Sequence, residues 1–325
     1  LDLVGGTNTI TLKATHETIL IDKIRVTDNF NVYYVATNGD DSNAGTYWKP
    51  WKTLAKASGG FETDGNGGFL NSRDRVLFRS GDTFKGELKV KRSGIEDNPI
   101  VISYYGPGEL PILSGSGNVS GGDYLSAVNL VNASHITMSH LWIKNDRQND
   151  TRYGWNDKKS HGIYCQANKW GGISSGLTFH NLKITDVYSV GLPEDFDAIK
   201  VTGLRFESDA NGEDAEGNVT TEVRFADVLI EDCYLSHIGK AGIWATHSGD
   251  WDNSDWTINR NMNFVIRKNT FFQTGGSGVI LGKMYNALVE NNDFDHTGYS
   301  NGTQTRLAGR GSGMWTFRCK HVIAQ

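Results

Sequence analysis

The segment 244–256 concentrates side chains that suit the chemistry of sugars. It contains three tryptophans, three aspartates and a histidine. Flat indole faces stack on sugar rings, and carboxylates hydrogen-bond hydroxyl groups and act as general acids or bases. The segment supplies candidate substrate-binding residues, Trp244, His247 and Trp251, and candidate catalytic residues, Asp250 and Asp252. The competing interpretation is a solvated acidic loop whose tryptophans shield the flank of the fold.

Asp250 and Asp252 are two positions apart, so both side chains point to the same side if the segment is extended. Cleavage of a glycosidic bond needs one carboxyl group to protonate the leaving oxygen and a second to act as base or nucleophile. The pair therefore predicts either a catalytic carboxylate that works with a distant acid such as Asp197, or a Ca²⁺ site.

A second acidic cluster, formed by Glu194, Asp195 and Asp197, precedes Lys200. Two carboxylates about 5–10 Å apart would suit a glycosidase. Asp195 and Asp197 could equally hold Ca²⁺ beside a lysine base in a lyase. The alternative is a solvated turn, because short acidic runs are common in loops.

Two basic residues stand in glycine-rich turns. Arg310 lies among three glycines within 308–313, where its guanidinium could pair with a uronate carboxylate or a sulfate. Lys240 follows the turn glycine Gly239, and a lysine there could abstract the proton α to a uronate carboxylate. Both are candidate catalytic residues, and in both cases the alternative is a plain exposed turn.

The composition limits what can position these residues. Thirty-nine glycines against five prolines, with 38% hydrophobic residues in 325, describe a turn-rich β protein. The formal charge of −5, with no lysine or arginine block, excludes a nucleic-acid partner. The longest apolar runs are strand-sized, which excludes a membrane-spanning helix of about 20 residues. Three cysteines without a CxxC pair predict buried thiols.

A repeat of the form apolar-x-x-polar-x-apolar occurs five times. Alternation along a strand places the apolar pair inside a coil and the polar residue at a bend, where it can bond neighbouring coils as a ladder. The repeat predicts that five polar residues stack at one corner, namely Ser139, His180, Cys233, Asn269 and Asn292. It predicts that their apolar companions point inward, namely Leu141, Leu182, Leu235, Phe271 and Phe294.

A second anchor, glycine-apolar-x, predicts a further strand in each coil. Its copies begin at Gly162, Gly242, Gly278 and Gly313. Insertions follow or precede these anchors, at 146–160, 207–221, 247–262 and 299–311. Insertions at one corner of a solenoid gather on one face. We therefore expect 146–160, 247–262 and 299–311 to form a groove lined by three tryptophans, Trp244, Trp251 and Trp315.

The segment Tyr33-Tyr34-Val35 through Asn38-Gly39-Asp40 to Trp51-Lys52-Thr53-Leu54 resembles the entry of many secreted right-handed parallel β-helix proteins. Gly81-Asp82-Thr83-Phe84 and Asn98-Pro99-Ile100-Val101 continue the resemblance to about residue 116. It implies a helix over 48–57 that plugs the open end of the solenoid. With the repeats, it predicts an all-β, right-handed parallel β-helix with a short N-terminal capping helix.

Residues 1–28 contain two alternating runs around a polar turn, which predicts a hairpin. This hairpin resembles the last two strands of jelly-roll carbohydrate-binding modules. The implied organisation is the end of such a β-sandwich module at 1–28 and a β-helix domain at 29–325. Because 322–325 have the pattern of a strand interior, we expect the β-helix to continue beyond Gln325.

Taken together, the chain resembles the glycoside hydrolases and polysaccharide lyases that are built on this fold. The resemblance implies a secreted or cell-surface enzyme that degrades a polysaccharide, and the excess of acidic candidates favours hydrolysis over lyase chemistry. Ca²⁺ is the only cofactor suggested. The alternative is a non-catalytic, glycan-binding or adhesin-type β-helix, which assembles with further domains or with copies of itself.

Overall fold

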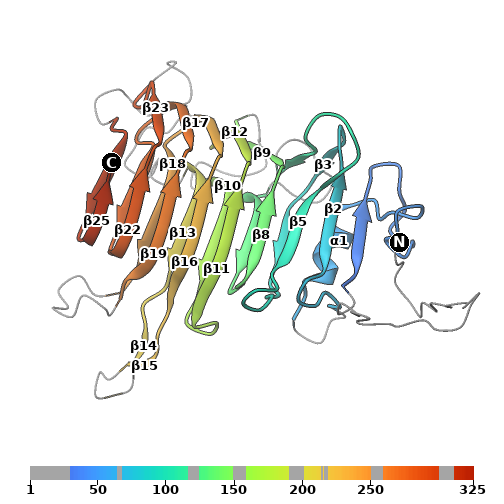
Figure 1. The fold of residues 1–325 in the computed structure, drawn as a ribbon, viewed down its shortest axis with the longest axis horizontal. Coiled ribbons are helices and arrows are strands. Elements are labelled where there is room, and N and C mark those ends of the chain that lie inside the picture. Colours follow the sequence, from blue (N-terminus) through green and yellow to red (C-terminus); the bar gives the residue numbers. More distant parts are fainter. Residues whose placement is uncertain are drawn as a thin grey trace, which may run out of the picture.

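A computed structural model describes residues 30–63, 68–115, 124–148, 159–189, 201–213, 215, 219–249, 259–299 and 311–325. These residues form 25 strands and one short helix, so the protein is nearly all β. The strands stack along one axis from the N-terminal end to the C-terminal end (Figure 1). The predicted hairpin at 1–28, and with it the proposed module boundary, lies outside the described residues.

Three parallel sheets carry the fold, and we name them I, II and III in the order in which the chain visits them. Sheet I contains nine strands in the order β1 (Val32–Val35), β2 (Arg75–Arg79), β5 (Ile100–Tyr105), β8 (Ile136–Ser139), β11 (Ile173–His180), β16 (Arg224–Glu231), β19 (Asn261–Arg267), β22 (Met284–Glu290) and β25 (Lys320–Ala324).

Sheet II contains seven strands in the order β3 (Thr83–Lys85), β6 (Ile112–Ser114), β9 (Trp142–Asp146), β12 (Lys183–Tyr188), β17 (Tyr234–Ile238), β20 (Thr270–Thr274) and β23 (Asp293–Asp295). Sheet III contains seven strands in the order β4 (Leu88–Val90), β7 (Ser126–Val131), β10 (Ser160–Ala167), β13 (Val201–Ser208), β18 (Ala241–His247), β21 (Val279–Gly282) and β24 (Met314–Phe317).

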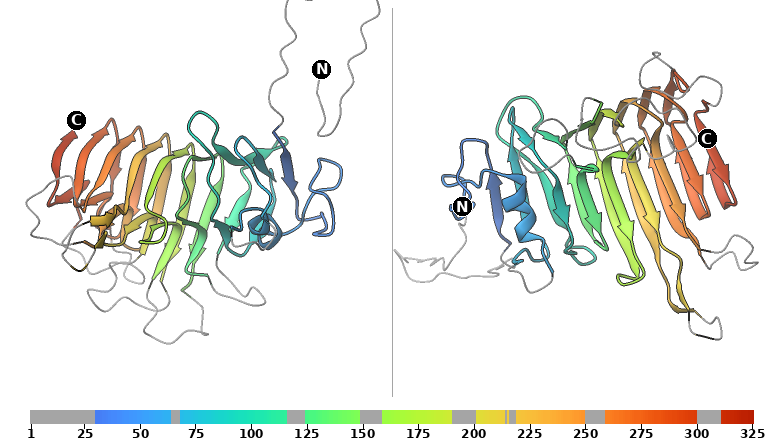
Figure 2. Two further views of the ribbon diagram at one scale, coloured as in Figure 1. Left: turned by 90° about the horizontal axis from the view of Figure 1, so that it is seen from below. Right: turned by 180° about the vertical axis from the view of Figure 1, so that it is seen from behind.

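From β2 onward the chain returns to sheet I after one strand in each of the other two sheets, so each of these turns of the solenoid is one triangular coil. Figure 2 shows these coils from two further sides. The predicted right-handed parallel β-helix is confirmed. An antiparallel hairpin, β14 (Gly212–Glu213) with β15 (Val219–Thr221), projects between β13 and β16.

The capping helix α1 spans Leu54–Gly60 and begins later than the 48–57 predicted from the sequence. Thr53 is its N-cap, because the Thr53 side chain accepts the Lys56 N–H. Asp41 holds this cap by accepting the Thr53 hydroxyl at 2.6 Å. The Ser58 hydroxyl accepts the Lys89 N–H at 2.9 Å, so the helix covers the free edge of β4 in sheet III.

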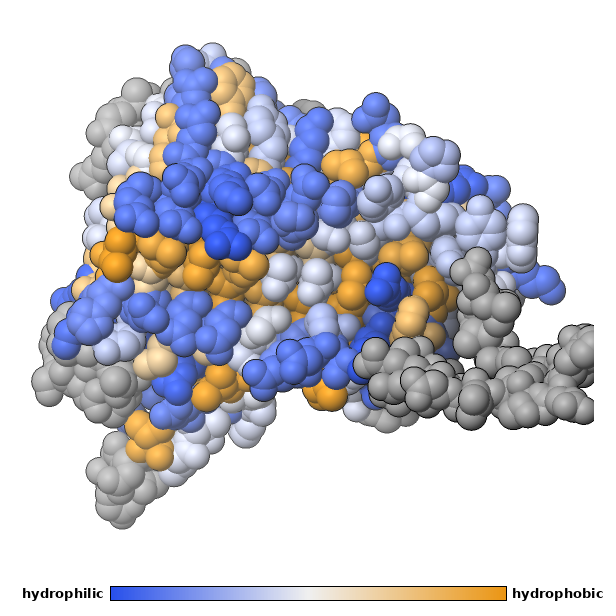
Figure 3. All heavy atoms as spheres, in the orientation of Figure 1, coloured by the Kyte–Doolittle hydropathy of each residue, from blue (hydrophilic) through white to orange (hydrophobic). Residues whose placement is uncertain are grey.

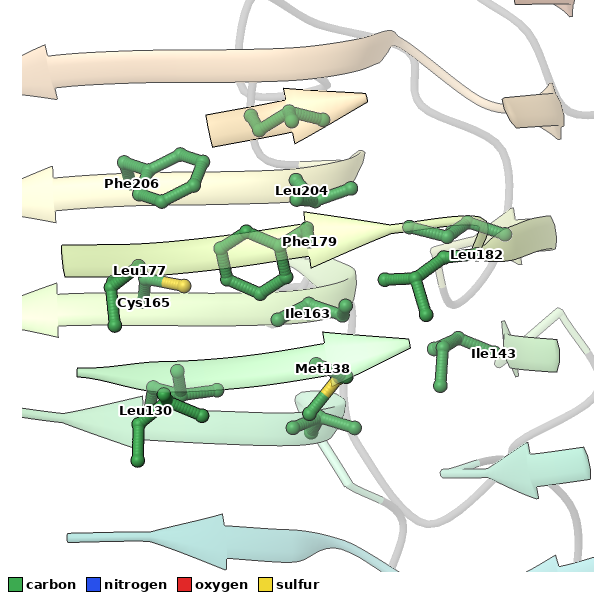
Figure 4. Packing of buried hydrophobic residues seen from close by; sticks show 14 of the residues in the cluster. Leu130, Met138, Ile143, Ile163, Cys165, Leu177, Phe179, Leu182, Leu204 and Phe206 are labelled. Atoms are coloured by element: carbon green, nitrogen blue, oxygen red, sulfur yellow. The ribbon is translucent and has the colours of Figure 1, made fainter. Parts of the chain in front are cut away.

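Alternation along each strand places apolar side chains inside the triangle. Figure 4 shows Leu130, Cys165 and Phe206, which occupy one register position on three neighbouring strands of sheet III. All three are buried in the main core. Cys165 and Cys233 are free, buried thiols, and burial raises the pKa of Cys233 to about 12. Both are the buried thiols predicted from the sequence, whereas the third cysteine, Cys319, is only partly buried.

The polar ladder forms at the corner between sheets I and II, but with a corrected register. Asn269 Oδ1 accepts the Cys233 N–H at 3.0 Å, and Asn292 Oδ1 accepts the Asn269 N–H at 3.0 Å. Ser139 and His180 do not belong to this ladder, because both lie in sheet I, where His180 pairs with Glu231. The first two copies of the repeat are therefore displaced by two residues.

The displacement has a simple cause. Lys183 pairs with Tyr234, so Leu182 stands beside Cys233, while Ile184 is the partner of Leu235. A shift of two residues preserves which face each side chain points to, and apolar residues occupy both Leu182 and Ile184. The predicted inward direction is confirmed, because Leu141, Leu182, Leu235 and Phe271 are buried and Phe294 packs against them.

The glycine-apolar-x anchors align in sheet III as predicted. Ile163, Ile243, Val279 and Met314 occupy one register position, joined there by Leu204. The insertions, however, do not share a single corner. Those at 146–160 and 299–311 join sheet II to sheet III, whereas that at 247–262 joins sheet III to sheet I. The insertions 146–160 and 299–311 precede a strand of sheet III, whereas 247–262 follows one. They therefore connect to opposite ends of the sheet III strands, and not to one corner as predicted.

No helix in the described part of the chain is long and apolar enough to cross a membrane.

Candidate functional site

The outer face of sheet III carries one row of side chains that crosses all seven strands. The register places in this row Lys89, Asn129, Tyr164, Arg205, Trp244, Ile280 and Trp315. Each lies next to a core residue that points inward, so alternation directs this row outward. Trp244 and Ile280 belong to a small apolar cluster that is separate from the main core. The face is therefore partly aromatic and partly polar.

A compact group of four side chains lies at the middle of this row: Tyr164, Arg205 and Trp244 from the row itself, and Glu207, two residues after Arg205 on β13. The Arg205 guanidinium lies over the Trp244 ring, with its central carbon 4.9 Å from the ring centroid. Arg205 Nε is 3.6 Å from Glu207 Oε2, and the Tyr164 hydroxyl donates to that same oxygen at 2.7 Å. Tyr164, Arg205 and Glu207 thus meet on two adjacent strands, β10 and β13.

The electrostatics of this group favour a carboxylate over a carboxylic acid. Burial would raise the pKa of Glu207, but the Arg205 charge and the Tyr164 hydrogen bond outweigh it and lower the pKa. Burial, followed by the Glu207 charge, raises the pKa of Tyr164, which therefore remains a proton donor. The Glu207 side chain is 39% exposed and can reach a ligand.

Two N–H groups of the same group lack acceptors. Arg205 is 7% exposed and Trp244 is 8% exposed. Arg205 Nη1 and Trp244 Nε1 are both buried without a hydrogen-bond partner. Most buried donors in folded proteins are satisfied, so two such donors on one row require an explanation.

The N-terminal part of the face is polar and internally bonded. Gln166 Nε2 donates to Asn129 Oδ1 at 2.7 Å. The Ser126 hydroxyl donates to Glu87 Oε1 at 2.8 Å, and burial raises the pKa of Glu87. Glu87 lies on the chain next to β4, three strands away from β13, so it does not form a pair with Glu207.

Of the residues predicted from the sequence, Trp244 and Trp315 lie in the outward row. Trp315 is 53% exposed, and its ring centroid is 5.6 Å from that of Phe317. Two strand spacings separate the tryptophans, because β21 lies between β18 and β24. Trp315 is open to solvent, whereas Trp244 is largely buried.

His247 is buried at the end of β18, and both of its ring nitrogens are bonded to the backbone. Nε2 lies 2.6 Å from the Val223 carbonyl, and Nδ1 accepts the Gly249 N–H at 2.9 Å. The carbonyl requires a proton on Nε2, so the ring is the neutral Nε2–H tautomer. Burial lowers the pKa of His247 to about 4. These bonds fix the corner between sheets III and I.

Lys240 lies in the turn before β18 and is almost fully buried. Its ammonium lies beside Gly276, where an added Cβ would come within 2.8 Å of Nζ. The remaining predicted catalytic, binding and calcium-site residues lie outside the described residues, namely Asp195, Asp197, Asp250, Trp251, Asp252 and Arg310.

A different set of potential metal ligands lies where β11 and β16 of sheet I end. His180, Glu231 and Asp232 offer ligand atoms within 4.8 Å of one another. Arg267 already binds Glu231 Oε2 through Nε and Nη2, each at 2.8 Å. Because this cation competes for one of the three ligands, the cluster is an ion-pair network rather than a prepared metal site.

The outer face of sheet I itself carries an aliphatic band between two hydrophilic bands (Figure 3). The register assigns to this band Leu229, Val265, Leu288 and Ile323. Aliphatic side chains lack the flat faces and hydrogen-bonding groups that recognise sugars. Sheet III is therefore the stronger candidate for the functional face.

Tyr164, Arg205 and Glu207 were not among the site residues predicted from the sequence. The signal was available, because Gly203-Leu204-Arg205 is a further copy of the glycine-apolar-x anchor. The third residue of each copy points outward, so comparison of these positions would have identified Tyr164, Arg205 and Trp244 together.

No protein-family model and no curated protein matches the chain. The fold is similar to that of the GH136 lacto-N-biosidase from Eubacterium ramulus in its selenomethionine form, with a TM-score of 0.71 and 22% identity over 90% of this chain and 50% of that one. The native form gives a TM-score of 0.69 with 22% identity, over 90% and 51% of the two chains.

A pectate lyase matches more weakly, with a TM-score of 0.41 and 14% identity over 90% of this chain and 79% of that one. The chain spans about half the length of the biosidase chain. What this chain shares with the biosidase is the β-helix fold.

Proposed function

We propose that the protein binds a polysaccharide along the outer face of sheet III and degrades it there, by hydrolysis in preference to β-elimination. The observation that carries the proposal is the group in which Tyr164 and Arg205 hold the ionised carboxylate of Glu207, with the Arg205 guanidinium stacked on Trp244. The similarity of the fold to that of a lacto-N-biosidase supports a glycan as the substrate.

The dimensions of the row suit a chain-like ligand. Seven strands spaced by about 4.8 Å give a row of roughly 29 Å. Trp315 offers an exposed ring face at one end of this row, and Asn129 and Gln166 offer amides at its N-terminal half. Stacking and hydroxyl bonding are the two interactions by which proteins hold sugars.

Hydrolysis is favoured because Glu207 presents an ionised carboxylate on this face. In the proposed reaction Glu207 acts as base, nucleophile or charge stabiliser, and a second carboxyl group protonates the leaving oxygen. The proposed second carboxyl comes from the candidates Asp197, Asp250 and Asp252. A lyase would instead require a base such as Lys240 with Arg310 on the uronate, which is the second enzymatic candidate.

The remaining elements of the proposal follow from the sequence. They are secretion or display at the cell surface, a carbohydrate-binding module that ends at about residue 28, and Ca²⁺ at Asp195 and Asp197. The non-catalytic alternative keeps the same binding face and omits the reaction.

A polysaccharide screen tests the proposal, with products followed both as new reducing ends and as unsaturated uronates. We expect reducing ends without unsaturation, and we expect Glu207→Gln to lower turnover about 10²-fold or more while glycan binding persists. Glu290→Gln is the matched control on sheet I and should retain activity. Unsaturated products would select the lyase, and binding without cleavage would select the non-catalytic alternative.

A further inference from the structure

The two unsatisfied donors on sheet III belong to side chains in direct contact. The Arg205 guanidinium covers the Trp244 ring, so Nη1 and the indole Nε1 belong to stacked groups. Neither nitrogen has a hydrogen-bond partner, and each is buried. The pair therefore forms a local concentration of unused N–H groups on the face that we propose binds glycan.

Glu207 does not satisfy Arg205. Its Oε2 lies 3.6 Å from Arg205 Nε, which is beyond hydrogen-bonding distance, and it already accepts the Tyr164 hydroxyl at 2.7 Å. Neither Glu207 nor Tyr164 supplies an acceptor to Arg205 Nη1. An unsatisfied buried donor shifts an equilibrium by roughly ten- to hundredfold against the state that contains it. A ligand that supplies the acceptor recovers this factor.

The acceptor that fits best is an oxyanion. A buried guanidinium favours a negative charge beside it, and a carboxylate or a sulfate has several oxygens that can accept from more than one donor. A sugar hydroxyl offers acceptor capacity without a formal charge.

We propose that Arg205 Nη1 and Trp244 Nε1 bind the carboxylate or sulfate group of an acidic glycan. The inference rests on the proposed function and narrows its substrate class from glycans in general to acidic ones. Glu207 accepts from Tyr164 and approaches Arg205 only at Nε. In the proposal, the acceptor for Arg205 Nη1 therefore comes from the ligand.

The test uses the indole N–H resonance of Trp244, which is identified in an NMR spectrum of ¹⁵N-labelled protein as the signal lost in Trp244→Phe. The protein is titrated with glucuronate, with glucose 6-sulfate and with neutral glucose. We expect the Trp244 signal to shift downfield and to saturate with one or both anions, and we expect it to respond at least about tenfold more weakly to glucose.

Arg205→Gln should abolish the saturable shift, and Arg205→Lys should weaken it about tenfold, because an ammonium lacks the planar fork. Thermal unfolding of each variant shows whether it is folded. If Arg205→Gln fails to fold, Arg205→Lys still decides the question. Trp48→Phe is the matched control, because Trp48 is an exposed tryptophan outside the row, and it should leave the Trp244 response unchanged.

A Trp244 signal that ignores both anions, or one that shifts equally in Arg205→Gln, overturns the inference. This result does not depend on the polysaccharide screen. Cleavage of neutral polymers together with a silent Trp244 signal would retain the proposed function and reject acidic substrates. A saturable anion response without any polysaccharide binding would retain the anion site and contradict the proposed function.

Discussion

Phe271→Ala tests the packing of the core, because the Phe271 side chain is fully buried inside the solenoid. Its ring stacks on Phe294 with centroids 4.9 Å apart and an interplanar angle of 10°. On the sheet III side it faces the backbone of Gly242, where an added Cβ would lie 2.4 Å from Phe271 Cδ1. The backbone around Gly242 is hydrogen-bonded to a neighbouring strand on each side, so it cannot move in to fill the space left by the ring.

Removal of a ring from such a site costs about 3–5 kcal/mol. The free energy of unfolding is measured by urea denaturation, followed by both circular dichroism and tryptophan fluorescence. Coincident transitions and an unchanged m-value show that the comparison with the unmodified protein is valid.

Phe272→Ala is the matched control, since Phe272 is the next residue of β20 and points outward toward His237 and His296. We expect this change to cost less than about 1 kcal/mol, as most surface substitutions do. Equal losses from the two substitutions, or a loss below about 1 kcal/mol for Phe271→Ala, would refute the register of sheet II.

Three further predictions concern the ladder, the corner and the site. Asn269→Ala should destabilise the protein by about 2–4 kcal/mol in the same urea assay, because it leaves the Cys233 N–H and the Ile230 carbonyl unpaired; an effect below about 0.5 kcal/mol, the size usual for surface substitutions, would contradict the ladder. His247 has a pKa of about 4 in the folded protein against an ordinary histidine value of 6.5, so below pH 6.5 the unfolded chain binds a proton that the folded chain does not. Stability should therefore fall between about pH 6.5 and 4, and His247→Gln should lose this component of the pH dependence. The pH dependence of hydrolysis should reflect a Glu207 pKa below its ordinary value, and Tyr164→Phe should raise that pKa, measured from the acidic limb of kcat/KM.

The sequence was sufficient to predict the architecture, because a solenoid repeats its local rules. Glycine and the apolar residue after it mark each strand of sheet III, and the Asn269–Asn292 pair marks the corner. The register of the first two coils could not be fixed in this way. Leu182 and Ile184 are both apolar and face the same side, so only the pairing across strands distinguishes them.

The candidate site was predicted only in part. Trp244 and Trp315 were found because aromatic residues in a polar context are conspicuous. Arg205 and Glu207 were missed because Gly203-Leu204-Arg205-Phe206-Glu207 has the alternation of an ordinary strand. Their significance comes from neighbours on β10 and β18, which lie about 40 residues away in sequence and one strand spacing away in space.

The glycine column connects the core to the functional face. Gly203, Gly242 and Gly278 each face a large core side chain from sheet II, and a Cβ at Gly242 or Gly278 would meet a phenylalanine ring at 2.4 Å. These glycines let the core side chains of sheet II approach the backbone of sheet III closely. Two residues later each strand presents Arg205, Trp244 or Ile280 to the outside. The packing that stabilises the coil thus also fixes the backbone from which the Arg205 and Trp244 donors project. A rigid sheet can hold unsatisfied donors in place for a ligand, whereas a loop would rearrange to satisfy them.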